Sequence, residues 1–256
     1  MERDCYDEIM GIATMRKLII ATLLFVIAPV AFGQTAGEPK AQVQPSENGS
    51  SQSPKGWSRT GAHRENYYLT ADSKVRHGGR ASATLISKNA ASSDGFGSMK
   101  QEIKADDYRG KRLRYSGFVK TEIGDQHAAL WMRVEGEEGK ILAFDNMDSS
   151  RPVKKANGWK RYEIVLDIPD DALFIALGAL FEGKGQIWVD DLKLETVGQD
   201  TVKTDMHSSP EAKREMEEDD EEYRRTHKVE FEKSVRQAKE RLSTMPSRPV
   251  NFDFEN

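Results

Sequence analysis

The chain of 256 residues has little cysteine and little net charge. Its single cysteine, Cys5, lies near the N-terminus, which excludes a disulfide framework and a cysteine-ligated metal site. The formal net charge of −4 is far from the basic balance typical of nucleic-acid-binding domains, so we expect no nucleic-acid partner. Hydrophobic residues make up 37% of the chain and charged residues 31%, which indicates that part of it lies outside a packed core.

Catalytic motifs are missing as well. The sequence contains no GxSxG elbow, no P-loop, no GxGxxG that opens a helix, and no HxH or HExxH pair. We therefore expect a protein that is not an enzyme. One alternative stays open, because glycoside hydrolysis needs only two carboxylates that can be distant in the sequence. The candidates for such a pair are Glu135, Glu182 and Asp145.

No apolar run reaches the roughly 20 residues of a membrane span. The longest covers 18–31, follows two basic residues, and leads to small residues, Ala31 and Gly33, at the −3 and −1 positions of a cleavage site. We expect 1–33 to contain an N-terminal extension and a signal peptide, with translation starting at Met15 and a periplasmic or secreted product. The alternative is an uncleaved membrane anchor.

The residues that follow divide into a polar linker and a region of short strands. Residues 34–55 are rich in Gln, Ser, Pro, Gly and Glu, which predicts a disordered linker. From 56 to 198, apolar and polar residues alternate between clusters of Gly, Asp and Asn, and no long period of 3.6 intervenes. This pattern predicts an all-β jelly-roll sandwich of eight or nine strands. Strands are expected at 81–87, 96–103, 111–121, 128–135, 140–144, 161–168, 173–181 and 186–196.

Two segments of this region carry a family pattern: YRGKRLRYSGFVK at 108–120 and GKGQIWVDDLKLE at 183–195. With them, Trp57–Val197 resembles the galactose-binding-like, carbohydrate-binding-module-like jelly roll of bacterial exported proteins. Similar segments accompany bacterial regulators and hydrolase-like proteins as an accessory domain. The resemblance implies the fold, and it leaves the ligand open because a fold does not determine a function.

The best candidate for a ligand surface lies on two consecutive strands. If Leu130 and Met132 face the core, Trp131 and Arg133 share the outer surface, and Asp145-Asn146 at the end of the next strand can join them. An aromatic ring beside charged and amide groups suits sugar recognition, since the ring packs on C–H groups and the polar groups bind hydroxyls. In the alternative, Trp131 packs between the sheets and Arg133 pairs with Asp145 as a scaffold.

A metal site is suggested by the resemblance alone. In galactose-binding-like modules an aspartate near the last strand often helps to hold a structural calcium ion with backbone carbonyls, and Asp190 or Asp191 matches that position. The alternative is a solvated strand end.

The tail at 199–256 is highly charged. Ser209 and Pro210 are typical of the first residues of a helix, and helix-compatible residues continue to about 244. We expect one helix over 210–244 with a narrow apolar stripe, which docks on the sandwich, forms a coiled coil with a protein partner, or stays free.

Two functional hypotheses follow. The first is an exported, non-catalytic module that binds a carbohydrate or a cell-envelope polymer. The second is an assembly protein with an inert sandwich, which acts through its C-terminal helix.

Overall fold

The computed structural model describes residues 53–88, 95–124, 126–147, 151–155, 158–205 and 209–256. The predicted leader, its cleavage site and nearly all of the predicted linker lie outside these ranges. None of the helices in the described ranges is long and apolar enough to cross a membrane.

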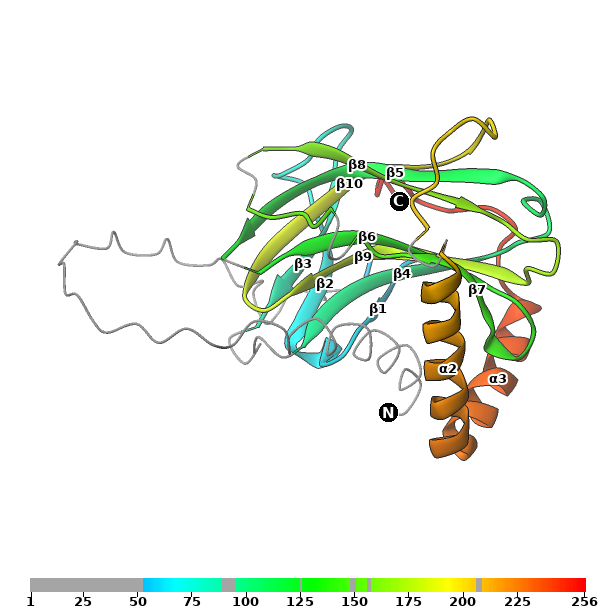
Figure 1. Ribbon diagram of the computed structural model, residues 1–256. Helices are drawn as coiled ribbons and strands as arrows, with labels where there is room; N and C mark the ends of the chain where they lie inside the picture. Colours follow the sequence, from blue (N-terminus) through cyan, green and yellow to red (C-terminus); the bar gives the residue numbers. More distant parts are fainter. Residues whose placement is uncertain (1–52, 89–94, 125, 148–150, 156–157, 206–208) are drawn as a thin grey trace, which may run out of the picture.

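Ten antiparallel strands form two five-stranded sheets that pack face to face (Figure 1). Sheet A has the order β1-β4-β9-β6-β7, and sheet B has the order β2-β3-β10-β5-β8. Two single-turn helices, η1 (Arg64–Asn66) and η2 (Glu137–Gly139), lie between strands. The strands are β1 (Ser58–Thr60), β2 (Tyr67–Asp72), β3 (Ser82–Ser87), β4 (Phe96–Lys104), β5 (Arg112–Ile123), β6 (Ala128–Glu135), β7 (Ile141–Asp145), β8 (Lys160–Asp167), β9 (Phe174–Glu182) and β10 (Gly185–Val197). The predicted jelly-roll class is confirmed.

The core lies between the sheets and is built by alternation along each strand. On β5, Leu113, Tyr115 and Val119 are buried as the sequence predicts. Tyr67 of sheet B meets Phe181 of sheet A edge to face, with ring centroids 5.1 Å apart. This contact identifies the inner face of each sheet, and every second residue along a strand shares it.

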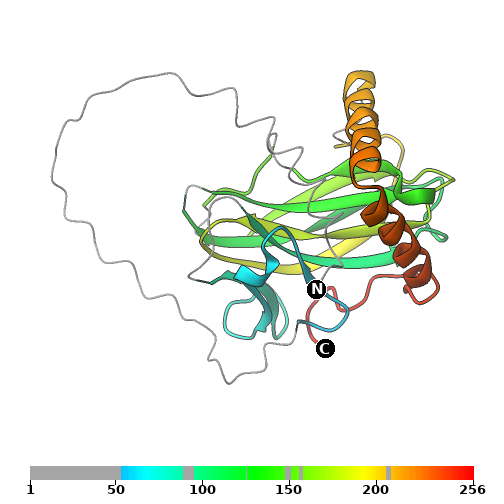
Figure 2. The same ribbon diagram turned by 90° about the horizontal axis from the view of Figure 1, so that it is seen from below.

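The C-terminal segment 245–256 returns to the sandwich and closes one of its sides (Figure 2). Phe252 and Phe254 pack against Trp57, with ring centroids 5.7 Å and 5.6 Å away. The side-chain amide of Gln101 on β4 bonds both the backbone N–H and the carbonyl of Val250. Although β10 ends next to the predicted boundary at 198, these last residues therefore belong to the sandwich and not to an independent tail.

Two helices, α2 (Pro210–Thr226) and α3 (Lys228–Leu242), replace the single predicted helix over 210–244. Ser209 caps α2 as expected, because its hydroxyl accepts a bond from the Ala212 amide at 3.1 Å. The helix breaks at His227, whose φ is −124° and ψ is 40°. The Thr226 hydroxyl donates to the Glu222 carbonyl at 2.8 Å, a back-bond that bends helices.

Candidate functional site

The outer face of sheet A carries Trp131 and Arg133. Residues that oppose each other on neighbouring antiparallel strands point to the same face. Leu130 opposes the inward-facing Ala179, while Trp131 opposes Gly178 and Arg133 opposes Ala176. The predicted placement of Trp131 and Arg133 together on the outer face is therefore seen, and the alternative in which Trp131 packs between the sheets is not.

A glycine beneath the indole explains how Trp131 lies on this face. Its Nε1 donates to the hydroxyl of Ser98 at 2.9 Å, and Ser98 belongs to β4, two strands away. To reach it, the indole crosses β9 above Gly178, where a Cβ would lie 3.0 Å from Nε1 and 1.8 Å from the Met99 carbonyl oxygen. Any side chain at 178 would collide with the backbone as well as with the indole.

Charged pairs lie on β6 and on β4, the two strands that neighbour β9. On β6, Arg133 donates to Glu135 through Nε at 2.6 Å. On β4, Lys100 donates to Glu102 at 3.0 Å. On β9, Gly178 lies opposite Trp131 and Lys100, and Ala176 lies opposite Arg133 and Glu102, whereas Phe174 lies opposite Glu135. Trp131 itself is 8% exposed.

Asp145 does not join this face, whereas the part of Asn146 in binding stays a prediction. Asp145 opposes Met132, so it lies on the inner side of sheet A, and it is fully buried. One carboxylate oxygen accepts the Met147 amide at 2.7 Å, and the other pairs with Arg151. The expectation that Asp145 lies beside Trp131 is wrong, because β7 continues its alternation to Asp145 and places it on the opposite face. The scaffold alternative also names the wrong partner, since Arg133 pairs with Glu135.

Asp190 and Asp191 hold a loop. Asp190 accepts backbone amides from His77 at 2.7 Å, Gly78 at 3.1 Å and Asp191 at 2.8 Å. Burial raises the pKa of Asp190 above its ordinary value, with a smaller contribution from the charge of Asp191, although the three amides favour the carboxylate. Asp191, at φ 47°, contacts His77 Nδ1 at 2.5 Å, and the His77 ring stacks on Phe118.

This arrangement does not fit a calcium cage. A calcium ion needs six to eight oxygen ligands, whereas amide hydrogens already point at both oxygens of Asp190. The described ranges contain no group of three or more His, Cys, Asp or Glu that could hold a metal ion. Calcium binding through Asp190 or Asp191 stays an untested prediction that this geometry disfavours.

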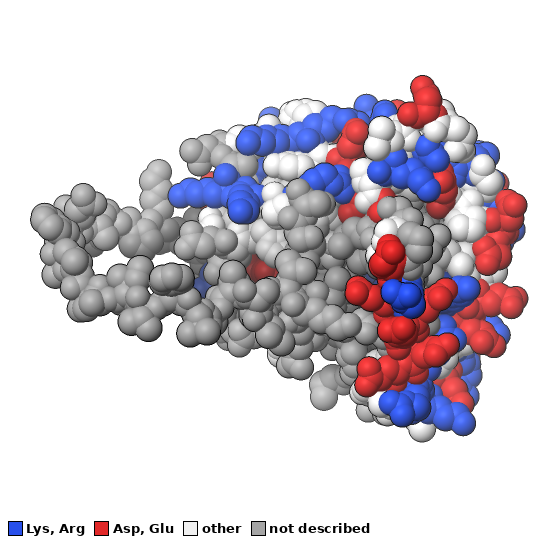
Figure 3. Space-filling view, in the orientation of Figure 1, with Lys and Arg blue, Asp and Glu red and all other residues white. Residues whose placement is uncertain are grey.

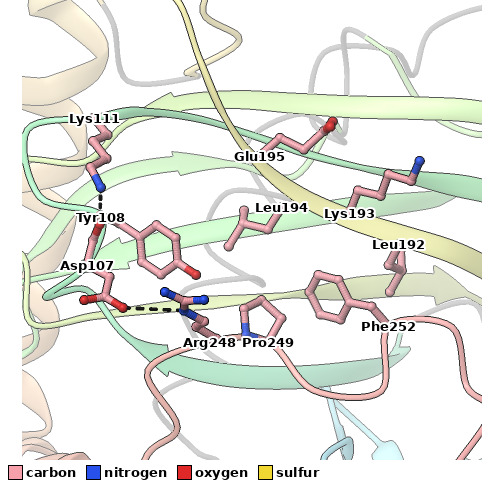
Figure 4. Close-up of a pocket in the computed structure, with 10 residues that line it drawn as sticks. All are labelled: Asp107, Tyr108, Lys111, Leu192, Lys193, Leu194, Glu195, Arg248, Pro249 and Phe252. Carbon is pink, nitrogen blue, oxygen red and sulfur yellow. Dashed lines mark hydrogen bonds and ion pairs between the residues drawn. The ribbon is translucent and has the colours of Figure 1, made fainter.

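A separate cavity of about 680 Å³ opens beside the C-terminal segment (Figure 4). Tyr108, Leu194 and Phe252 give it an apolar wall, and Arg248 on its rim pairs with Asp107 at 3.7 Å. Further charged groups of both signs surround it, so the rim selects no ligand charge. For a polymer ligand the outer face of sheet A is the better candidate, because it carries an indole between charged pairs on two strands.

The sequence did not reveal Gly178 or Ser98 as members of this site, and it suggested Glu135 only as one of a pair of catalytic carboxylates. Gly178 interrupts the apolar strand IALGALF at 175–181, and a glycine inside a strand is the signal for close approach of another group. The partner across the sheet, Ser98, depends on strand order, which one sequence does not give.

Comparisons with known proteins give one sequence relative and several structural ones. No family model matches the chain. It is 39% identical over 152 residues to the uncharacterized HTH-type transcriptional regulator YbfP of Bacillus subtilis (strain 168). The match covers 59% of this chain and 51% of that protein, so the chain spans about half of the length of this curated relative.

The solved structures that it is similar to include carbohydrate-binding modules. The CBM22-1 xylan-binding domain of Paenibacillus barcinonensis Xyn10C is 13% identical, with 57% of this chain and 88% of that one covered and a TM-score of 0.42. TmCBM61 in complex with beta-1,4-galactotriose is 15% identical, with 57% and 91% covered and a TM-score of 0.39.

Proposed function

We propose that the chain is a non-catalytic binding module that holds a carbohydrate chain, or a related cell-envelope polymer, on the outer face of sheet A around Trp131. The observation that carries this proposal is the indole of Trp131, which lies along the sheet above Gly178 with Nε1 fixed on Ser98. A ring held flat in this way can pack against the C–H face of a sugar without losing side-chain freedom on binding.

The polar side chains beside the ring supply the directional contacts. Arg133 and Glu135 offer donors and an acceptor on one side, and Lys100 and Glu102 do so on the other. Sugar hydroxyls both donate and accept, so paired charges of opposite sign suit them better than a patch of one sign. An exported product, as expected from the apolar run at 18–31, would meet such polymers outside the cytoplasm.

Tryptophan fluorescence during titration with soluble glycans tests the proposal. We expect a saturable shift in the wild-type protein and an affinity lowered by about tenfold or more in Trp131→Ala, since one central aromatic residue commonly carries a large share of a binding energy. Trp159→Ala is the matched control, because Trp159 is partly exposed just before β8 of sheet B and lies beside His77.

Calorimetric titration of the same panel gives a second readout that does not depend on fluorescence. No heat with any glycan class, from a protein whose circular dichroism shows folded strands, would count against the proposal. Equal loss of affinity in Trp131→Ala and Trp159→Ala would move the site away from sheet A.

The second candidate function is assembly through the helices, with a sandwich that only carries them. The observation in its favour is an exposed apolar side chain on α3: Val229 is 72% exposed. Replacement of 206–243 by a flexible linker should then abolish partner capture or self-association, whereas glycan binding through sheet A would be unchanged.

A further inference from the structure

One segment of the sandwich, 151–162, carries an excess of positive charge and leads into β8. It contains five Lys or Arg residues and no Asp or Glu, whereas the whole chain has a formal net charge of −4. Figure 3 shows Lys and Arg side chains gathered at the upper left of the molecule, where β8 begins. Charge segregated in this way creates a local positive potential on a chain of acidic balance.

The described backbone of this segment is held on both sheets. Val153 forms an isolated bridge to β6 of sheet A through two backbone hydrogen bonds of 2.8 Å. On sheet B, the Thr121 hydroxyl of β5 donates to the Lys154 carbonyl at 3.3 Å, and Lys160 opposes Val119 of β5. Lys154 and Lys160 are therefore attached to positions two residues apart on β5, or about 7 Å.

Three lysines on this backbone have no acidic partner. Lys154, Lys155 and Lys160 are exposed, and none of them forms an ion pair within the part of the chain that the structure describes. Lys160 opposes the core residue Val119, whereas the exposed carboxylate of β5, Glu122, belongs to the outer face of sheet B. The three ammonium groups are thus available to an anionic ligand.

The two arginines of the segment are engaged within the protein. Arg151 pairs with the buried carboxylate of Asp145. Arg161 donates to Glu163 at 2.6 Å, so the carboxylate that follows the segment in sequence already has a basic partner. The arginines therefore neutralise the two described carboxylates that border the segment, and the lysines carry its uncompensated charge.

We propose that Lys154, Lys155 and Lys160 bind an acidic polysaccharide, with its carboxylates on their ammonium groups. Lysine suits such a chain, because an ammonium is a point charge on a flexible stem and needs no fixed pairing geometry. Three free charges are few for a nucleic acid, whose protein partners make roughly 6–10 phosphate contacts. They are also few for an anionic bilayer, which clusters of about 4–8 basic residues bind. The site lies apart from Trp131 and does not depend on glycan binding there.

Calorimetric titration of the full chain with polygalacturonate tests the proposal. The matched neutral probe is the same polymer with its carboxyl groups methyl-esterified. We expect saturable binding of the acidic form and none of the ester. Binding should weaken between about 0.1 M and 1 M salt, as the Debye length falls from about 10 Å to about 3 Å. No binding of the acidic form, or equal binding of both forms, would overturn the proposal.

Replacement of the three lysines identifies the surface. The variant Lys154→Gln, Lys155→Gln and Lys160→Gln should bind polygalacturonate about tenfold more weakly or worse, because the charges that attract the polymer are removed. The control has the same net charge and should bind as the wild type does, since it removes exposed lysines elsewhere: Lys55→Gln, Lys111→Gln and Lys239→Gln. Equal losses in the two variants would show that only the net charge of the chain matters and would contradict the proposal.

Two further measurements separate this site from other modes of binding. Trp131→Ala should keep its affinity for polygalacturonate, and the variant without the three lysines should keep its affinity for neutral glycans, so failure of one proposal is distinguishable from failure of the other. Unchanged circular dichroism shows that each variant folds. Tighter binding to duplex DNA or to phosphatidylglycerol vesicles than to polygalacturonate would contradict the proposal and assign the lysines to a different partner.

Discussion

Asp190 and Gly178 show how single residues determine the two outer faces of the sandwich. On the outer face of sheet A, Gly178 has no side chain, so the indole of Trp131 can lie across β9 at this position. On sheet B, Asp190 takes three backbone amides into one buried carboxylate and fixes the loop that carries His77. Gly178 acts by leaving room for a neighbouring group, and Asp190 acts by binding the backbone of a neighbouring loop.

Asp190→Ala should destabilise the protein by about 3 kcal/mol, because amide donors lose their acceptor at a buried site. Asp191→Asn is the control; it keeps a residue type that tolerates a positive φ and should cost far less. Thermal unfolding measured with calcium and with EDTA checks both points. A calcium-dependent rise in Tm that disappears in Asp190→Ala would show that a metal ion, and not the amides, is the partner of this carboxylate.

At the scale of elements, the strands were predictable where they alternate over a long stretch. The eight predicted strands are present with ends shifted by a residue or two, because burial of one face imposes the period of two on the sequence. Two of the ten strands, β1 (Ser58–Thr60) and β2 (Tyr67–Asp72), were missed. Three residues are too few to show a period, and in β2 the buried positions alternate only over its first four residues. The break at His227 was missed because Thr226 and His227 are compatible with a helix in sequence and depart from it through a local hydrogen bond.

The candidate site was predictable only in part, because the sequence does not give the pairing between strands. Alternation along β6 placed Trp131 and Arg133 together, since both belong to one strand. Asp145 belongs to another strand, and its face depends on the register between β6 and β7, which includes an irregularity between Val134 and Glu135. Contacts between strands need that register, and a single sequence does not supply it.

The pair Arg112–Asp167 joins β5 to β8 and gives a pH-dependent contribution to stability. The hydrogen bond from Arg112 is the main reason that the pKa of Asp167 lies below its ordinary value. A lowered carboxyl pKa stabilises the folded state above the ordinary value, about 3.9 for Asp, and this stabilisation is lost as the pH falls through the lowered one.

Arg112→Met should therefore reduce the free energy of unfolding at pH 7, and the difference from the wild type should shrink below about pH 4. Urea unfolding at a series of pH values measures this difference. Arg161→Met is the control, because Arg161 pairs with Glu163 on the exposed surface of the same strand. A difference that stays constant down to pH 2 would show that packing of the Arg112 stem, and not its charge, is responsible.

For the whole molecule, the return of 245–256 to the sandwich makes the helices α2 and α3 an insertion between two parts of one β-sandwich. Removal of 245–256 should abolish cooperative unfolding near the wild-type Tm, because Phe252 and Phe254 leave Trp57 and loss of one buried aromatic side chain costs about 3–5 kcal/mol. Replacement of 206–243 by a flexible linker should leave a folded sandwich. Thermal scans by circular dichroism compare the two, and equal melting would contradict the role of the segment.

The contact of Trp57 with this segment also bears on how the chain reaches its folded state. The indole Nε1 of Trp57 donates to the carbonyl of Asn251, 194 positions away in the sequence. Contacts of such sequence separation close long loops and tend to form late. The emission of Trp57, isolated by replacement of the other three tryptophans, would therefore follow the final step of folding, and amide exchange at its partners would report the first opening of the native sandwich.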